Sequence, residues 1–215
     1  MAEYTNDDER LLAIVDFIKH YKKLIITVLG SISVIGISIF GLKSIQYSNN
    51  EAAGALYNKW IEEAAIQENG LMDDSVVFDE LVIDFKSTGF AQLAILKKAS
   101  ALAENSQLDL SKKYFEDLES LSSGLFGNDL LNKMSKVSLA RILISEKNYT
   151  EALNKLESLM SGSDPLVKEL AGDALAGQKS NDLAIEQYNF AKDLYTDEAS
   201  KNIVIMKLNN IKEVL

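Results

Sequence analysis

The chain has 215 residues, of which 47% are apolar and 25% charged, and its formal net charge is −10. This composition is typical of a globular protein, and a single proline in the whole chain favours helices over turn-rich structure. The absence of cysteine excludes a disulfide framework and thiolate metal sites. Residues 49–215 hold 17 basic and 27 acidic side chains, so we expect no nucleic-acid partner.

The first predicted element is a transmembrane helix over residues 24–42, which follows a short leader, residues 1–23. The sequence LIITVLGSISVIGISIFGL contains no charge, and as a helix it would be about 28 Å long, close to the ~30 Å hydrocarbon core of a bilayer. A buried core helix of this length would normally have a polar side. The predicted anchor includes Leu24, Gly30, Gly36 and Leu42.

The charges beside this segment predict its orientation. Lys19, Lys22 and Lys23 precede it, whereas only Lys43 follows it closely. The positive-inside rule therefore keeps the leader in the cytoplasm and sends the rest of the chain across the membrane. A cleaved signal peptide is the alternative, but the apolar run is longer than the usual h-region of about 7–15 residues.

Residues 43–90 are expected to form juxtamembrane helices that lead into the main domain. Between residues 49 and 69, apolar or small residues recur every four positions, as in a helix: Ala52, Leu56, Trp60 and Ala64. Gly70 ends this pattern, and the Asp-Asp-Ser stretch at 73–75 can cap the next helix.

Residues 91–195 contain three copies of one pattern, in which two helices each present a small residue followed by larger ones. Corresponding positions are 41 residues apart between the first and second copies and 32 apart between the second and third. We expect antiparallel helices to cross where both side chains are small. The residues assigned to this packing are Ala99, Ser111, Phe115, Ala140, Ala152, Leu156, Gly172, Ala184, Tyr188 and Ala191.

The last segment, residues 196–215, has apolar residues on one face and is predicted to cap the end of the stack. The sequence thus predicts an all-α protein, with one N-terminal transmembrane helix followed by a solenoid of helical hairpins. A plain helical bundle is the alternative.

No pattern typical of catalysis is present. His20 is the only histidine and lies among lysines, so it cannot complete a Ser/His/Asp arrangement within the repeats. The acidic pairs at 62–63 and 73–74 are chain neighbours and suit helix caps or solvated faces. Without a phosphate-binding loop either, we predict no enzyme activity, cofactor or metal site.

The third copy resembles the tetratricopeptide repeat, a hairpin of about 34 residues with small residues at its eighth, twentieth and twenty-seventh positions and an aromatic at the twenty-fourth. Gly172, Ala184, Tyr188 and Ala191 match these positions. Lys168 stands where tryptophan is usual and Leu175 where tyrosine is usual, so the repeat is degenerate.

The whole chain resembles the YfgM-like family, the membrane-anchored ancillary subunits of the bacterial Sec translocon, whose repeat domain is related to that of the cell-division coordinator CpoB. The stretches ELAGDALAGQKSNDLAIEQYNFA (169–191) and IMKLNNI (205–211) carry this resemblance. It implies a bacterial inner-membrane protein with a periplasmic C-terminal domain. It also implies Sec translocon subunits and a periplasmic chaperone of the prolyl-isomerase type as partners, and a role with newly exported proteins.

The alternative function is a membrane-anchored scaffold for another envelope complex, such as division or secretion machinery, because a fold does not fix its partner. The sequence indicates neither the oligomeric state nor the residues that contact partners. Leu125 and Phe126, in the insertion between the first two copies, are candidates for an exposed binding loop.

Overall fold

The computed structural model describes the backbone of residues 7–67, 69–72, 75–124 and 127–214. Within these ranges it describes the side chains of residues 11–24, 26–28, 31, 49–67, 69–71, 75–124 and 127–211. The chain divides into two compact units, Met1–Glu51 and Ala52–Leu215, and each is considered by itself.

The described part of the chain is all-helical and contains no strand. Its elements are α1 (Asp7–Ile66), η1 (Gly70–Met72), α2 (Val76–Asp84), α3 (Gly89–Glu104), α4 (Leu108–Leu121), α5 (Asp129–Ser145), α6 (Tyr149–Glu157), α7 (Pro165–Gly177), α8 (Asn181–Leu194) and α9 (Glu198–Val214). The helices α3 to α8 thus cover residues 89–194, where the sequence places repeats over 91–195. The cap predicted for residues 196–215 corresponds to α9.

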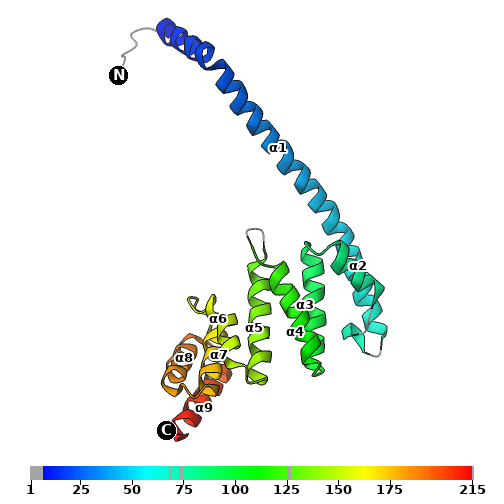
Figure 1. Ribbon diagram of the computed structural model, residues 1–215, viewed down its shortest axis with the longest axis vertical. Helices are drawn as coiled ribbons and strands as arrows, with labels where there is room; N and C mark the ends of the chain where they lie inside the picture. Colours follow the sequence, from blue (N-terminus) through cyan, green and yellow to red (C-terminus); the bar gives the residue numbers. More distant parts are fainter. Residues whose placement is uncertain (1–6, 68, 73–74, 125–126, 215) are drawn as a thin grey trace. The chain divides into compact units, whose positions relative to one another are not determined.

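The second unit is a solenoid of helical hairpins. Consecutive helices contact one another from α2 to α9, and the pairs α3/α4, α5/α6 and α7/α8 form the hairpins (Figure 1). In addition, α3 contacts α5 and α5 contacts α7. The first helices of successive hairpins therefore form one layer, as in repeat proteins in which each repeat packs on its neighbours.

Several helices begin at residues whose side chains accept a hydrogen bond from the first turn. Ser75 accepts from the N–H of Phe78 before α2, and Asn128 does the same for Leu131 before α5. Thr88 caps α3, and Asp164 caps α7 just before its proline. Such caps satisfy backbone N–H groups that the helix cannot, typically stabilising it by about 1 kcal/mol.

The core of the solenoid consists of three apolar clusters in chain order. The first joins the end of α1 to α2, α3, α4 and α5 and is rich in aromatic rings, with Trp60 5.2 Å from Phe78 between ring centroids. The second joins α5, α6 and α7 around Leu156. The third joins α8 to α9 through Tyr188 and Val204. Each hairpin therefore buries its apolar residues against the next one.

Among the residues that the structure describes, no helical stretch has the length and hydropathy of a membrane span. The side chains of residues 25, 29–30 and 32–48 lie outside the described ones, and they include most of the predicted span. Of its named positions, Leu24 is described and is exposed, whereas Gly30, Gly36 and Leu42 lie outside the described side chains.

Candidate interaction surface

The ten residues assigned to repeat packing are all buried in the structure, in the helices that form the three hairpins. In the first hairpin the two small residues meet, since the Ser111 hydroxyl donates to the Ala99 carbonyl at 2.8 Å. Ala140, Ala152 and Leu156 belong to the cluster between the second hairpin and α7. The predicted small residues therefore lie inside the solenoid and leave its surface to other side chains.

In the third hairpin an aromatic ring lies against the predicted small residue of the first helix. A Cβ on Gly172 would lie 2.6 Å from Cδ1 and Cε1 of Tyr188, so the tyrosine ring occupies the space next to this glycine. The aromatic residue four positions after Ala184 thus packs directly on the predicted glycine. The physical reason is size, because only glycine leaves room for a ring in van der Waals contact with the helix backbone.

The turns inside the three hairpins share one backbone conformation. Ser106, Lys147 and Lys179 have φ angles of 61°, 63° and 62°, in the left-handed region. The N–H of the next residue bonds back across each turn, from Gln107 to Leu102 O in the first, with equivalent bonds in the other two. This is the Schellman arrangement, in which glycine is usual at the left-handed position.

A polar cluster holds α9 against α7. Lys207 Nζ donates to Glu169 Oε1 and to Asp173 Oδ2, both at 2.7 Å. The remaining oxygens accept from tyrosines, with Tyr188 Oη 2.7 Å from Asp173 Oδ1 and Tyr195 Oη 2.6 Å from Glu169 Oε2. These five residues, named here the α9 clasp, satisfy all four carboxylate oxygens in a partly buried site.

The α9 clasp shifts the pKa values of its members. Burial raises the pKa of Tyr188, and the bond to Asp173 raises it further. The pKa of Tyr195 is raised by burial and by Glu169. Burial lowers the pKa of Lys207, but the two carboxylates outweigh this effect, so its pKa lies above the ordinary value of 10.5. All three groups therefore hold their protons more tightly in the folded chain.

Two open depressions of about 620 and 610 Å³ are each lined in part by α5, and Lys136 Nζ in the lining of the second donates to Ser158 Oγ in the lining of the first at 2.9 Å. We call them together the α5 groove. Its polar lining comes from α4, α5, α6 and the loops at 122–124 and 158–164, and comprises Glu116, Glu119, Ser120, Ser122, Ser123, Asp129, Asn132, Lys133, Lys136, Lys155, Ser158, Ser161, Ser163 and Asp164.

Ion pairs set the charge pattern of the α5 groove. Lys155 Nζ lies 2.7 Å from Glu119 Oε2, and Lys133 pairs with Asp164. Burial raises the pKa of Asp164, but the bond to Lys133 and backbone N–H groups outweigh it and leave this pKa below its ordinary value. Glu116 and Asp129 remain as exposed acids at the rim.

The groove suits a polypeptide better than a small molecule. Small-molecule sites are mostly apolar and enclosed, whereas both depressions are open, and their mixed lining includes apolar side chains, hydroxyls, an amide and charges of both signs. Such groups can pair with the backbone and side chains of a docked protein. No cluster of histidine and acidic side chains that could hold a metal ion occurs in the described part of the chain.

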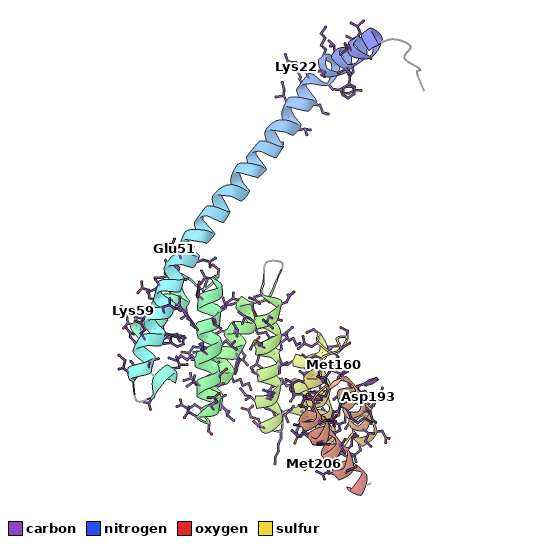
Figure 2. The ribbon with its side chains drawn as sticks, turned by 180° about the vertical axis from the view of Figure 1, so that it is seen from behind. Lys22, Glu51, Lys59, Met160, Asp193 and Met206 are labelled. Atoms are coloured by element: carbon purple, nitrogen blue, oxygen red, sulfur yellow. The ribbon has the colours of Figure 1, made fainter. Side chains whose placement is uncertain are left out.

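The remaining predicted positions lie in the first unit or outside the described residues. Lys19, Lys22 and Lys23 are exposed on α1, where Figure 2 labels Lys22. The candidate loop residues Leu125 and Phe126 lie outside the described residues, between α4 and the start of α5.

Two features were missed by the sequence analysis. Lys98 is only 2% exposed, and its Nζ lies 4.6 Å from the centroid of the Phe78 ring. A lysine in a helix gives no local sign of burial, because the aromatic residues around it come from other helices. The α9 clasp was missed for the same reason, although Glu169, Asp173 and Lys207 all fall in the stretches that carried the family resemblance.

Comparison with known protein families assigns this helical architecture to a class. The chain belongs to the tetratricopeptide repeat-like domain family, whose model matches residues 16–213. This match includes the hairpins α3 to α8 and nearly all of α9. Proteins of this class are helical-repeat scaffolds for protein–protein interaction, and so is the solenoid described here.

One curated protein is similar to this chain at the level of an individual protein, beyond the family. The chain is 27% identical over 129 residues to the ancillary SecYEG translocon subunit of Buchnera aphidicola subsp. Acyrthosiphon pisum. The alignment covers 55% of this chain and 66% of the relative, so it spans just under two thirds of that protein's own length.

Solved structures share the fold at low sequence identity. MamA from Desulfovibrio magneticus RS-1, residues 41 to the end, aligns with a TM-score of 0.52 at 16% identity, covering 77% of this chain and 94% of that chain. A double mutant of the same protein, MamA RS-1 ArsTM, gives a TM-score of 0.51 with 77% and 96% coverage. At this identity the similarity extends to the helical-repeat fold alone.

Proposed function

We propose that the protein is a non-enzymatic, membrane-anchored ancillary subunit of the Sec translocon. The observation that carries this proposal is the 27% identity to an ancillary SecYEG translocon subunit, in a chain whose second unit is a helical-repeat solenoid with open depressions on its surface. A scaffold of this kind acts by binding, because its surface offers contacts between proteins and none of its residue patterns is typical of catalysis.

The anchor in this proposal is the uncharged segment 24–42, with the leader in the cytoplasm and the solenoid in the periplasm. Support comes from the length of the apolar run and from the lysines on its N-terminal side. A tether confines the solenoid beside the export channel and raises its effective concentration there, so weak contacts suffice.

The partners in this proposal are Sec translocon subunits and a periplasmic chaperone of the prolyl-isomerase type, which would receive newly exported chains. We assign the periplasmic contact to the α5 groove. The paired and unpaired charges of its lining suit a polar protein surface, and polar contacts select partners as well as strengthening binding.

The test is co-purification of the full chain from membranes solubilised in mild detergent. Wild type should recover translocon and chaperone subunits. The double variant Glu116→Arg/Ser161→Arg changes two exposed groove positions, and it should lose the periplasmic partner while folding normally. Glu186→Arg on α8 is the matched control, because Glu186 is exposed and does not line the groove.

Recovery of neither partner with wild type would contradict the proposal. Recovery of a division or secretion complex in their place would support the alternative scaffold. Equal recovery with the groove variant and the control would refute the assignment of the α5 groove while leaving the tethered scaffold intact.

A further inference from the structure

The N-terminal part of α1 has an apolar face that is exposed among the described side chains of its unit. Between residues 11 and 21, seven large apolar side chains are 42–66% exposed. Leu11, Ile14, Val15 and Ile18 follow the spacing i, i+3, i+4 and i+7, which places them on one face of the helix. Phe17 and Tyr21 border this face, with their ring centroids 4.7 Å apart.

A second face of the same segment is polar. Asp16, Lys19, His20 and Lys23 also follow the spacing i, i+3, i+4 and i+7, starting from another side of the helix. Leu12 is the one large apolar residue that lies on this side. The segment is therefore amphipathic, and its basic residues concentrate next to the uncharged run that begins at Leu24.

We propose that residues 11–23 lie along the surface of an anionic membrane, with the face of Leu11, Ile14, Val15 and Ile18 buried in the lipid interface. This inference rests on the proposed membrane anchor. Lys19 and Lys23 lie beside the apolar face, and Lys22, four residues after Ile18, lies at the end of that face. An amphipathic helix with lysines around its apolar face is the pattern of interfacial helices, which bind through apolar burial and attraction to anionic lipids. The membrane entered at Leu24 is the nearest apolar phase that can cover this face.

The structure has one continuous helix through this region, and two contacts in it would ease a bend where the segment meets the span. Thr27 Oγ1 donates to Lys23 O, and Ser31 Oγ donates to Thr27 O, both at 2.9 Å. Hydroxyls that bond back to the carbonyl four residues earlier bend helices and can satisfy carbonyls that a bend frees. The chain can therefore turn between residues 23 and 31 from a surface-lying helix into a spanning one.

The lipid charge that this arrangement selects is negative. Lys19, Lys22 and Lys23 fall within one turn and a half at the end of the segment, and Figure 2 labels Lys22 there. Each lysine near an anionic surface strengthens binding, and salt screens the effect. In this arrangement residues 11–23 set the depth and the direction in which the segment 24–42 sits in the bilayer.

The test uses single-cysteine variants of the full chain, which has no cysteine of its own. The full chain is reconstituted in vesicles of phosphatidylcholine with phosphatidylglycerol, and nitroxide labels are placed at Leu11, Ile14 or Ile18 and, on the other face, at Asp16 or His20. We expect several-fold lower access of an aqueous relaxation agent at the first three positions. The pattern should repeat with the period of a helix, about 3.6 residues.

A label at Ile26 separates this inference from the anchor on which it rests. If Ile26 is shielded from the aqueous agent but the two faces of 11–23 are equally accessible, the surface helix is refuted and the anchor stands. If Ile26 is itself in water, the anchor fails and both proposals fall.

Lipid composition and added protein complete the test. In vesicles of phosphatidylcholine alone, or in Lys19→Gln/Lys22→Gln/Lys23→Gln, the difference between the faces should shrink several-fold. An unchanged difference would overturn the assignment of an anionic surface. Shielding of Leu11, Ile14 and Ile18 that arises only after translocon is added would show that the face binds protein, which also overturns the inference.

Discussion

At the scale of single residues, close contacts inside the solenoid depend on particular side-chain sizes. Gly172 faces the Tyr188 ring, which is only 3% exposed and is held by its bond to Asp173, so the ring cannot move away easily. An added methyl group must therefore displace the ring or separate α7 from α8. Overpacking of this kind typically destabilises a core by about 1–3 kcal/mol.

We predict that Gly172→Ala lowers the free energy of unfolding by about 1–3 kcal/mol despite the higher helix propensity of alanine. The measurement is urea unfolding followed by circular dichroism. Gly89→Ala is the control, because a Cβ on Gly89 would meet nothing within 4 Å. A Gly172→Ala variant as stable as Gly89→Ala would contradict the packing described here.

The α9 clasp predicts how stability depends on pH. Tyr188, Tyr195 and Lys207 all have raised pKa values in the folded chain. Their contribution to the free energy of unfolding is therefore complete below about pH 10 and is lost as the pH rises beyond the unfolded values. Each such group steepens the loss by up to about 1.4 kcal/mol per pH unit.

Urea unfolding between pH 8 and 11.5 measures this slope. We expect Tyr195→Phe and Lys207→Met to be less stable than wild type at pH 8 and to lose less stability on the way to alkaline pH. A slope that stays the same in both variants would argue against the α9 clasp.

At the scale of elements, the hairpin turns show which features of the repeats the sequence pattern predicts and which it does not. The left-handed residues Ser106, Lys147 and Lys179 are 41 and 32 residues apart, which are the intervals between the copies in the sequence. The repeat pattern could be predicted because it depends on residues close in the chain. The turn conformation could not, because lysine or serine at a left-handed position gives no signal of the kind that glycine gives.

The same limit applies to the candidate groove and the buried lysine. The lining of the α5 groove comes from four helices, α4 to α7, and two loops, so no single stretch of sequence indicates it. The burial of Lys98 depends on Phe78 and Tyr114, which lie in other helices. Periodicity predicts which face of a helix is buried, but not which distant side chains share a site with it.

The turns themselves allow a test. We predict that Lys179→Gly stabilises the protein by up to about 1 kcal/mol, because glycine adopts a φ near 62° without the strain of a side chain. Lys97→Gly in the exposed interior of α3 is the matched control and should cost about 1 kcal/mol. Thermal unfolding compares the two. A Lys179→Gly variant that melts as low as Lys97→Gly would disprove the shared turn geometry.

At the scale of the whole molecule, the proposed function depends on a binding surface and a tether. The family match extends from residue 16 to residue 213, so the repeat-like class covers almost the entire chain. The solenoid supplies the surface, with the α5 groove as the proposed contact, and the uncharged segment 24–42 supplies the proposed tether. In this proposal neither part needs chemistry of its own, since confinement beside a partner raises its effective concentration.

The most direct measurement is photo-crosslinking in intact cells, with a photoreactive amino acid placed at Glu116 or Ser161 in the groove, or at Glu186 outside it. We predict that the two groove positions capture a translocon or chaperone subunit and that Glu186 does not. Capture of cytoplasmic proteins, or of nothing from either groove position, would contradict the account of a periplasmic solenoid that binds the export machinery.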